Sequence, residues 1–323
     1  MKPEPTTVRT LLARLWRTDK PLTSAGLLML AALAAFAVGL LVDPRTIGGA
    51  PAWMKPAKFA LSTAIYTLTL AWIFTLLPSW RRTRVLAGWT TAAIIVMEVA
   101  IIAVQAWRGT TSHFNVSTPV DGALFGIMGA GIVLQTLSTV LVAIALFREP
   151  FAQRAMGAAL RAGMVITIVG ASSAGFMTQP TAAQVAELRE TGHMPRVGAH
   201  TVGAPDGGEG LIGTGWSRQH GDLRIPHFFG LHALQVLPIV ALVARRRRPD
   251  ETAVRVVRVA AASYVALFGI LLFEALNGEP VLAPGPATLA LLAAWALGTS
   301  AGIGSVARWG RSAATRVSAY AGA

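Results

Sequence analysis

The 323 residues of this chain are 54% hydrophobic and only 13% charged, which is about half the charged fraction of a soluble domain. This composition indicates an integral membrane domain of several apolar helices. The net charge of +13 does not indicate nucleic-acid binding, because the basic residues lie in short clusters between apolar runs, and the absence of cysteine excludes disulfides, iron–sulfur clusters and thiol chemistry.

The chain begins with a basic segment, residues 1–20. Within it, apolar residues such as Leu15 and Trp16 are interleaved with arginines such as Arg14 and Arg17. This pattern predicts an amphipathic helix that lies on the membrane surface, at the cytoplasmic side. The apolar run that follows is too long for the core of a signal peptide, so we expect it to be retained as the first span.

Apolar stretches of close to the twenty residues that a bilayer requires recur along the rest of the chain. Because lipid offers no hydrogen bonds to backbone groups, each stretch is predicted to be a helix. We therefore expect an all-α, polytopic transmembrane helical bundle of about eight spans, forming a single domain over residues 21–310, with a cytoplasmic tail at 311–323. The expected spans are approximately 22–42, 57–77, 85–107, 121–147, 156–178, 226–244, 256–276 and 286–306.

The distribution of basic residues predicts the orientation. With the N-terminus inside, 20 of the 28 Lys and Arg residues fall in inner segments. This bias places both termini in the cytoplasm and the chain in the plasma (inner) membrane, and a seven- or nine-span topology breaks the alternation. The arginine run 245–248 follows an apolar helix directly, so it indicates a stop-transfer anchor rather than a nucleic-acid patch.

The longest predicted connection is the outer loop 179–225, between the fifth and sixth spans. It contains a short helical stretch, Ala183–Glu190, and a glycine-rich run, Gly203–Gly215. Three glycines in this run match the dinucleotide-binding fingerprint, but no strand precedes them and no helix follows them, so we interpret the run as a flexible loop. Loops of this length are usually functional or disordered.

Each of the six histidines lies on or near the predicted outer side. Neutral imidazole is the usual ligand of zinc, copper and iron, including haem iron. His227 and His232 are five residues apart, so on one helix their rings point about 140° apart and do not form a simple bidentate pair. The residues predicted to bind metal or haem are His113, His200, His220, His227 and His232.

Ionisable and polar residues predicted at the same level suggest further roles. Glu98 lies deep in the third span and Glu274 near the outer end of the seventh, and an ionisable residue in hydrocarbon usually marks a pathway or a site. Both are candidate catalytic residues, with Glu98 as a proton relay. His232 and Gln235 share a helix face. The candidate cofactor-binding residues are Asp222, which would orient a histidine ring, Arg224, which would engage a carboxylate or propionate, and Gln235.

Simpler roles compete with these. His227 and Glu274 are near enough to the membrane interface to be hydrated. His113 is near enough to the end of the third span to cap it. Lys55 and Lys58 fit headgroup contacts by snorkelling better than ligand binding. Gln235 and His232 also fit a helix–helix hydrogen bond.

Three strings carry a resemblance. Trp-Met-Lys-Pro-Ala-Lys-Phe (53–59), Arg-Gly-Thr-Thr-Ser-His-Phe-Asn (108–115) and the stretch from Gly221 to Gln235 resemble those of a family of bacterial multi-pass integral membrane proteins of uncharacterised activity. This resemblance implies the membrane fold over most of the chain and no transferable activity. The general architecture is also similar to that of haem A synthase. That family places ligand histidines in four even-numbered spans, whereas the second and eighth spans here have none, so its function is not carried over.

Three functions are compatible with these features. The first is a metal- or haem-dependent membrane oxidoreductase with a His-ligated iron, copper or zinc and a small-molecule substrate or quinone as partner, beside the lipid bilayer. The second is a proton- or cation-coupled small-solute transporter, with Glu98 and His232 as its titratable pair and the long outer loop as its lid. The third is a non-catalytic scaffold or sensor. Several histidines at one level favour the metal enzyme. A transporter usually shows broken helices near the membrane centre, and Pro238 is the only proline in the interior of a predicted span.

Overall fold

The structure, a computed structural model, describes the backbone of residues 7–321 and the side chains as far as residue 309. Residues 1–6 of the predicted basic segment and residues 322–323 of the predicted tail lie outside the described residues. The chain is mostly helical. It divides into two compact units: unit 1 is Met1–Ala145, Thr178–Ala199 and Asp206–Gly208, and unit 2 is Leu146–Met177, His200–Pro205 and Glu209–Ala323.

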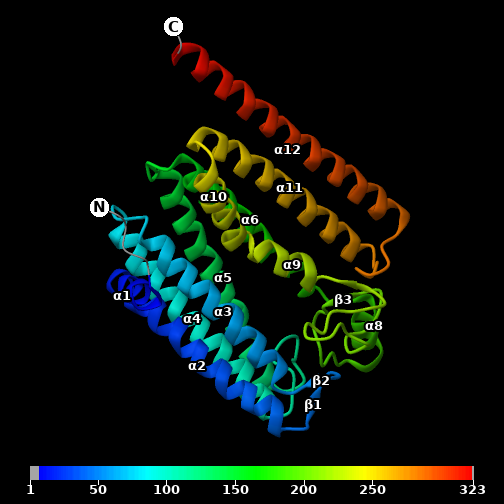
Figure 1. The fold of residues 1–323 in the computed structure, drawn as a ribbon. Coiled ribbons are helices and arrows are strands. Elements are labelled where there is room, and N and C mark those ends of the chain that lie inside the picture. The colour runs from blue at the N-terminus through cyan, green and yellow to red at the C-terminus, as the bar shows by residue number, and fades with distance from the viewer. Residues whose placement is uncertain (1–6, 322–323) are drawn as a thin grey trace. The chain divides into compact units, whose positions relative to one another are not determined.

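Unit 1 contains most of four long helices, two shorter helices and an antiparallel hairpin. Helices α2 and α3 pack closely together and both pack against α4 (Figure 1). In the hairpin, Thr46 of β1 lies opposite Pro51 of β2. The elements are α1 (Val8–Thr18), α2 (Lys20–Val42), β1 (Thr46–Ile47), β2 (Ala50–Pro51), α3 (Met54–Phe74), α4 (Arg81–Trp107), α5 (Pro119–Arg148, in unit 1 up to Ala145) and α8 (Ala182–Thr191).

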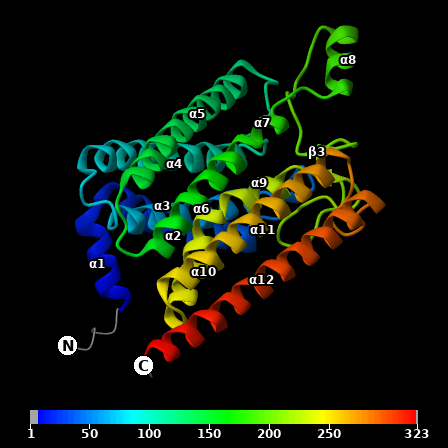
Figure 2. The same ribbon diagram turned by 90° about the horizontal axis from the view of Figure 1, so that it is seen from above.

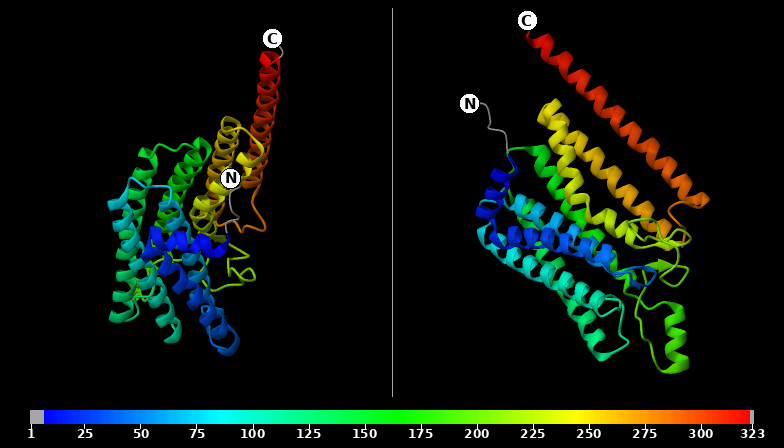
Figure 3. Two further views of the ribbon diagram at one scale, coloured as in Figure 1. Left: turned by 60° about the vertical axis from the view of Figure 1, so that its left-hand side comes forward. Right: turned by 60° about the horizontal axis from the view of Figure 1, so that its bottom comes forward.

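Asp19 separates the first two helices. Its extended backbone ends α1, its N–H donates to the carbonyl of Leu15, and its carboxylate accepts a hydrogen bond of 2.9 Å from the N–H of Leu22. Pro21 suits the first turn of α2, where a missing N–H costs nothing. Helix α1 is set at a steep angle to α2 (Figures 2 and 3). The helix expected within segment 1–20 is therefore present, and it is separate from the first span.

Unit 2 is arranged around α6, which packs against α9, α10 and α11 (Figure 2). Helix α12 lies along α11 in every view (Figures 1 to 3). Strands β3 and β4 form a short antiparallel ribbon, with Thr201 opposite Asp222. The elements are α6 (Arg154–Ser172), α7 (Ala174–Met177), β3 (Thr201–Val202), β4 (Gly221–Asp222), α9 (Arg224–Leu231), α10 (Ala233–Arg247), α11 (Asp250–Leu276) and α12 (Pro286–Ala321).

The helices are those of a multi-pass membrane protein. Among the described residues, seven helices are long and apolar enough to cross a membrane. They are α2, α3, α4, α5, the stretch Arg154–Thr191 that begins with α6, α11 and α12 as far as Trp309. Helices α9 and α10 pass the same test only as a bent pair, and they make an eighth span if the pair is counted as one. The multi-pass helical fold expected from hydropathy is thus confirmed.

The expected continuous helix over 226–244 is wrong in one respect, because the chain bends by 43° between α9 and α10. His232 lies at the break and belongs to neither helix. The hydroxyl of Tyr264 donates to the carbonyl of Phe229 at 2.6 Å, and Thr167 Oγ1 donates to the carbonyl of Leu231 at 3.3 Å. Neighbouring helices therefore satisfy carbonyl groups around the break, as the membrane interior requires.

Close backbone contact with α6 accompanies the break. A Cβ atom on Gly170 would lie 2.6 Å from the Cα of Gly230, and a Cβ on Gly163 would lie 2.9 Å from the carbonyl oxygen of Ala233. Small residues allow helices in membranes to approach in this way. The bend is thus held by contacts from α6 and α11, which lie far from it in the sequence.

Candidate functional site

Glu98 is a carboxylate in the interior of unit 1. It lies on α4, is only 3% exposed, and faces α5 at Gly131, where a Cβ atom would lie 3.6 Å from Glu98 Oε1. That oxygen has no hydrogen-bond partner in the described part of the chain. Lys55, at the start of α3, is close enough to attract the carboxylate electrostatically. A buried carboxyl group with an unpaired oxygen is suited to bind a proton or a cation.

Asp121, at the start of α5, is equally buried but fully bonded. Its Oδ1 accepts hydrogen bonds from Gln105 Nε2 at 2.8 Å and from Arg108 Nη1 at 2.6 Å, and its Oδ2 accepts one from Thr118 Oγ1 at 2.6 Å. Arg108 also donates to Gln105 Oε1. This cluster fixes the ends of α4 and α5 and engages both oxygens of the carboxylate.

A second polar group in unit 1 joins α3 to α5. Gln135 Nε2 donates to the hydroxyl of Tyr66 at 3.0 Å, and that hydroxyl lies 3.2 Å from Thr139 Oγ1. Gln135 lies one helical turn along α5 from Gly131, the residue that faces Glu98. The role of Tyr66 was not predicted, because the only signal for it in the sequence is its position within an apolar span.

His113 lies in the loop between α4 and α5, within unit 1. Its ring packs against Phe59 at 5.7 Å between ring centroids, against Phe114 at 6.2 Å and against Phe125 at 6.5 Å. Its Nδ1 lies 3.1 Å from Ser112 Oγ. The aromatic contacts anchor the loop over the ends of the helices, which accounts for His113 without a metal.

His227 of unit 2 is tied to α6. Its Nδ1 lies 2.8 Å from the carbonyl of Gly170. Because a carbonyl only accepts, the ring donates from Nδ1, and Nε2 is the acceptor of the neutral ring. His200, which precedes β3, lies near enough for the two rings to repel when both are charged. Of the predicted ligands, these two are thus brought near each other.

His232 occupies the break between α9 and α10. Its ring lies 4.2 Å from that of Phe228 between centroids, and it is hydrogen-bonded to the side chain of Gln235. The expected pairing of His232 with Gln235 is therefore present. His232 and Glu98 belong to different units, and they are described separately here.

The predicted cofactor-binding residues Asp222 and Arg224 bind each other. Arg224 Nε donates to Asp222 Oδ1 at 2.9 Å, and its Nη2 donates to Asp222 Oδ2 at 2.5 Å. Asp222 also accepts the N–H of Ser217 at 2.7 Å, and Arg224 donates to the carbonyl of Gly215 at 2.7 Å. Asp222 is 1% exposed. This bidentate pair holds the glycine-rich loop against the start of α9, and a propionate would have to displace it.

Glu274 is buried at the end of α11, near a second carboxylate, Glu279. Glu279 accepts hydrogen bonds from Thr288 Oγ1 at 2.6 Å and from the N–H of Gly285 at 2.8 Å. These two bonds lower the pKa of Glu279, because they favour its charged form. Glu279 therefore orders the turn before α12.

The predicted ligand set is not gathered into a metal centre in the part of the chain that the structure describes. No group of three or more histidine, aspartate or glutamate side chains there is placed to hold a metal ion. His113 belongs to unit 1, whereas His200, His220, His227 and His232 belong to unit 2. His220 lies in the loop before β4, with its N–H bonded to Ser217 Oγ. The prediction of a haem or a His-ligated metal therefore stays a prediction.

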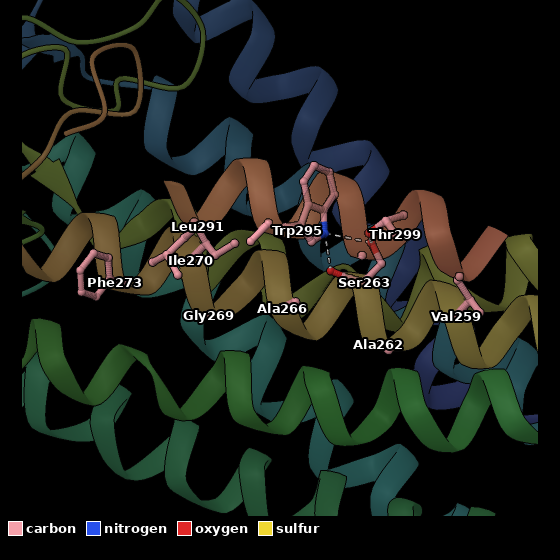
Figure 4. A pocket seen from close by; sticks show the side chains of 13 residues that line it. Val259, Ala262, Ser263, Ala266, Gly269, Ile270, Phe273, Leu291, Trp295 and Thr299 are labelled. Atoms are coloured by element: carbon pink, nitrogen blue, oxygen red, sulfur yellow. Dashed lines mark hydrogen bonds between the residues drawn. The ribbon is translucent and has the colours of Figure 1, made fainter. Parts of the chain in front are cut away.

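An open groove of about 630 Å³ lies between α11 and α12 in unit 2 (Figure 4). Its walls are mostly apolar, and its polar groups bond to one another: Trp295 Nε1 donates to Ser263 Oγ at 2.9 Å, and Ser263 Oγ lies 2.9 Å from Thr299 Oγ1. The groove therefore presents little unpaired polarity to a ligand.

Comparisons of the chain with protein-family models, with curated proteins and with solved structures found no match. The resemblance to bacterial multi-pass membrane proteins therefore stays an expectation, and the function must be argued from the residues themselves.

Proposed function

We propose that the protein is a membrane transporter that carries protons, with Glu98 as the group that binds and releases them. In this proposal the chain crosses the plasma membrane eight times, with α9 and α10 counted as one span and both termini in the cytoplasm. The bias of Lys and Arg toward alternate connections supports this orientation. Loop 179–225 then lies on the outer side.

The observation that carries the proposal is the state of the Glu98 carboxyl group. It lies well inside a span, is 3% exposed, and has an oxygen without a hydrogen-bond partner in the described chain. A structural carboxylate at this depth would be expected to be fully paired, as Asp121 is. A group that takes up and releases a proton must keep part of its bonding capacity open.

The break between α9 and α10 supports transport more than redox chemistry. Interrupted spans near the membrane midplane are frequent in transporters, where the broken ends form the sites for ions and substrate. The absence of such a break from the predicted spans counted against a transporter, and the 43° bend at His232 removes that objection.

The metal- or haem-dependent oxidoreductase remains the alternative, with iron, copper or zinc held by histidines and a quinone or other small molecule as substrate. In the described residues no specific contact favours it over transport. His113, His227 and His232 each have a neighbour that explains their position: a phenylalanine cluster, the Gly170 carbonyl and Gln235. The scaffold or sensor reading likewise has no feature of its own.

Proton flux into liposomes tests the proposal directly. Purified protein is reconstituted with potassium inside, valinomycin sets a membrane potential, and an enclosed dye reports the pH. We expect proton flux into liposomes with the wild type to be faster than into protein-free liposomes. Flux with Glu98→Gln should fall to the protein-free level, because an amide cannot bind and release a proton as a carboxyl group does.

Glu190→Gln, on the exposed face of α8, is the control and should match the wild type. A wild type no faster than empty liposomes would overturn the proposal. So would a Glu98→Gln variant that is folded and carries protons at the wild-type rate.

A further inference from the structure

Several buried polar atoms in unit 1 lack partners, and they lie on two helices. Among the described residues, the atoms without a hydrogen bond include Arg84 Nε, Thr91 Oγ1 and Glu98 Oε1 on α4, and Gln135 Oε1 and Ser138 Oγ on α5. Apart from Arg84, each of these side chains is more than nine-tenths buried. Unpaired polar atoms are costly inside a membrane, so such a group calls for a partner that is not another side chain.

On α4 these residues form one line. Arg84, Thr91 and Glu98 are spaced seven residues apart, which is close to two helical turns, so they stay on one face and each step advances about 10 Å. The line runs from the start of the helix to the middle of the span. It ends at the carboxyl group proposed above to bind protons.

On α5 the residues lie on the face that meets this line. Gly131 faces Glu98, and Gln135 and Ser138 follow on the same side of the helix at the fourth and seventh positions. Consecutive spans run in opposite directions. Thr91 lies seven residues before Glu98 on α4, and Ser138 lies seven residues after Gly131 on α5, so the two side chains are at about the same depth. Two unpaired hydroxyl groups are therefore placed level with each other, below Glu98.

The backbone of α5 approaches α3 and α4 less closely than those two helices approach each other. It reaches them through side chains, such as Tyr66 to Thr139 and Met97 at Gly131. The adjoining face of α4 packs differently: there Ile95 and Val99 join an apolar cluster with Met29.

The line begins beside a second ionisable group. Asp19, between α1 and α2, packs on α4 so closely that a Cβ atom on Gly88 would collide with its carboxylate. Arg84 acts on this carboxylate electrostatically, while burial raises the pKa of Asp19. Charged groups thus mark the end of the line, as at the mouth of an aqueous path.

We propose that a narrow water-filled path runs between α4 and α5, from Arg84 past Thr91 and Ser138 to Glu98. Water molecules would supply the missing hydrogen bonds to Thr91, Ser138 and Gln135, since polar buried spaces hold ordered water. This inference deepens the proposed function and rests on it. The path would connect Glu98 to the side of the membrane where Arg84 lies. In the predicted topology that side is the cytoplasm.

Cysteine labelling tests the path, because the natural chain has no cysteine. Thr91→Cys and Ser138→Cys place near-isosteric thiols on it. Ala93→Cys and Leu137→Cys place matched thiols at nearby depths on the exposed faces of the same helices, where lipid lies. A charged, membrane-impermeant thiol reagent is applied to each side of the reconstituted protein in turn.

We expect the two path cysteines to react at least about tenfold faster than the matched controls, because a thiolate forms in water and not in hydrocarbon. The reaction should occur only from the side of Arg84. Path cysteines that react as slowly as the controls, or only from the opposite side, would overturn the inference. Loss of proton flux in Glu98→Gln with unreactive path cysteines would leave the proposed function standing without this path. Reactive path cysteines with unchanged flux in Glu98→Gln would leave the path without its function.

A measurement on the unmodified protein guards against variants that fail to fold. Hydroxyl radicals generated from bound water oxidise the side chains beside it. We expect oxidation at Met97, which contacts α5 at Gly131, and much less at Met29, which is 3% exposed in the apolar cluster of the same unit. Equal, low oxidation of both methionines would contradict the path.

Discussion

At the break between α9 and α10 in unit 2, polar side chains bond to the backbone around them, whereas along the middle of α4 in unit 1 they do not. Tyr264, Thr167 and His227 each contact a carbonyl of a neighbouring helix. Thr91 and Glu98 keep an oxygen without a partner in the described chain. Both regions lie among apolar helices, where an unpaired polar group costs more than in water. The polar residues at the break in unit 2 hold a backbone in place, whereas Thr91 and Glu98 of unit 1 keep the bonding capacity that the proposed water path would use.

The largest effect is expected where a carboxylate is fully paired. Asp121→Ala should lower the free energy of unfolding by about 3 kcal/mol, since it leaves Arg108 and Gln105 without their acceptor. The lower end of the usual range applies because the Arg108 side chain is 33% exposed. Glu98→Gln should change it by less than about 1 kcal/mol, because Glu98 Oε1 has no hydrogen-bond partner in the described chain. Denaturant titration in detergent measures both, and equal losses would remove the distinction.

A glycine in each region gives the next largest contrast. Gly170→Ala should destabilise the protein by about 1–3 kcal/mol, because the added methyl meets the backbone of Gly230 at 2.6 Å and the backbone cannot turn away. In Gly131→Ala the only contact below 3.0 Å is with the flexible end of Met97, at 2.7 Å, so this substitution should be nearly neutral. The melting temperatures of the two variants decide the matter. A stable Gly170→Ala variant would mean that α6 does not hold the break closed.

Two tyrosines provide a finer test. Tyr264→Phe removes the hydrogen bond to the Phe229 carbonyl but keeps the stacking on the Phe229 ring, whose centroid lies 4.1 Å away. It should lower the free energy of unfolding by about 1 kcal/mol. Tyr66→Phe removes a hydroxyl that lies beside the proposed water path, where water can take over its bonds to Gln135 and Thr139, and it should cost less. Thermal unfolding compares the pair. A larger loss for Tyr66→Phe would indicate that no water reaches it.

The smallest effect is on the pH dependence of stability, and it concerns Glu279, which lies outside the spans. Hydrogen bonds from Thr288 and Gly285 lower the pKa of Glu279 below its ordinary value of 4.5. A carboxyl group whose folded-state pKa is depressed stabilises the fold above its unfolded-state pKa, and this contribution is lost as the pH falls through the folded-state value. Melting temperatures should therefore decline below about pH 4.5 in the wild type, and less steeply in Glu279→Gln. Parallel acid-side profiles would show that Glu279 is not ordered by this turn.

Much of the fold was predictable because hydropathy acts locally. The long apolar runs became helical, the one at 226–244 as the bent pair α9 and α10, and the helical stretch expected at Ala183–Glu190 is the helix α8. Glu98 was also predictable, since a single carboxylate within an apolar run is conspicuous whatever surrounds it. The bend at His232 was not, because nothing in Phe-Phe-Gly-Leu-His-Ala-Leu-Gln prevents a continuous helix.

The sequence by itself determined that the chain forms apolar helices long enough to span a membrane, because backbone groups in lipid must bond within the helix whatever lies beside it. Only the tertiary structure decided which polar residues are paired. It gave Asp121 and Asp222 arginine partners, left Glu98 Oε1 without one, and assigned His113 and the other candidate ligands to different units. Pairing depends on which helix faces come together, and that is set by contacts such as Gly170 with Gly230, between residues far apart in the chain.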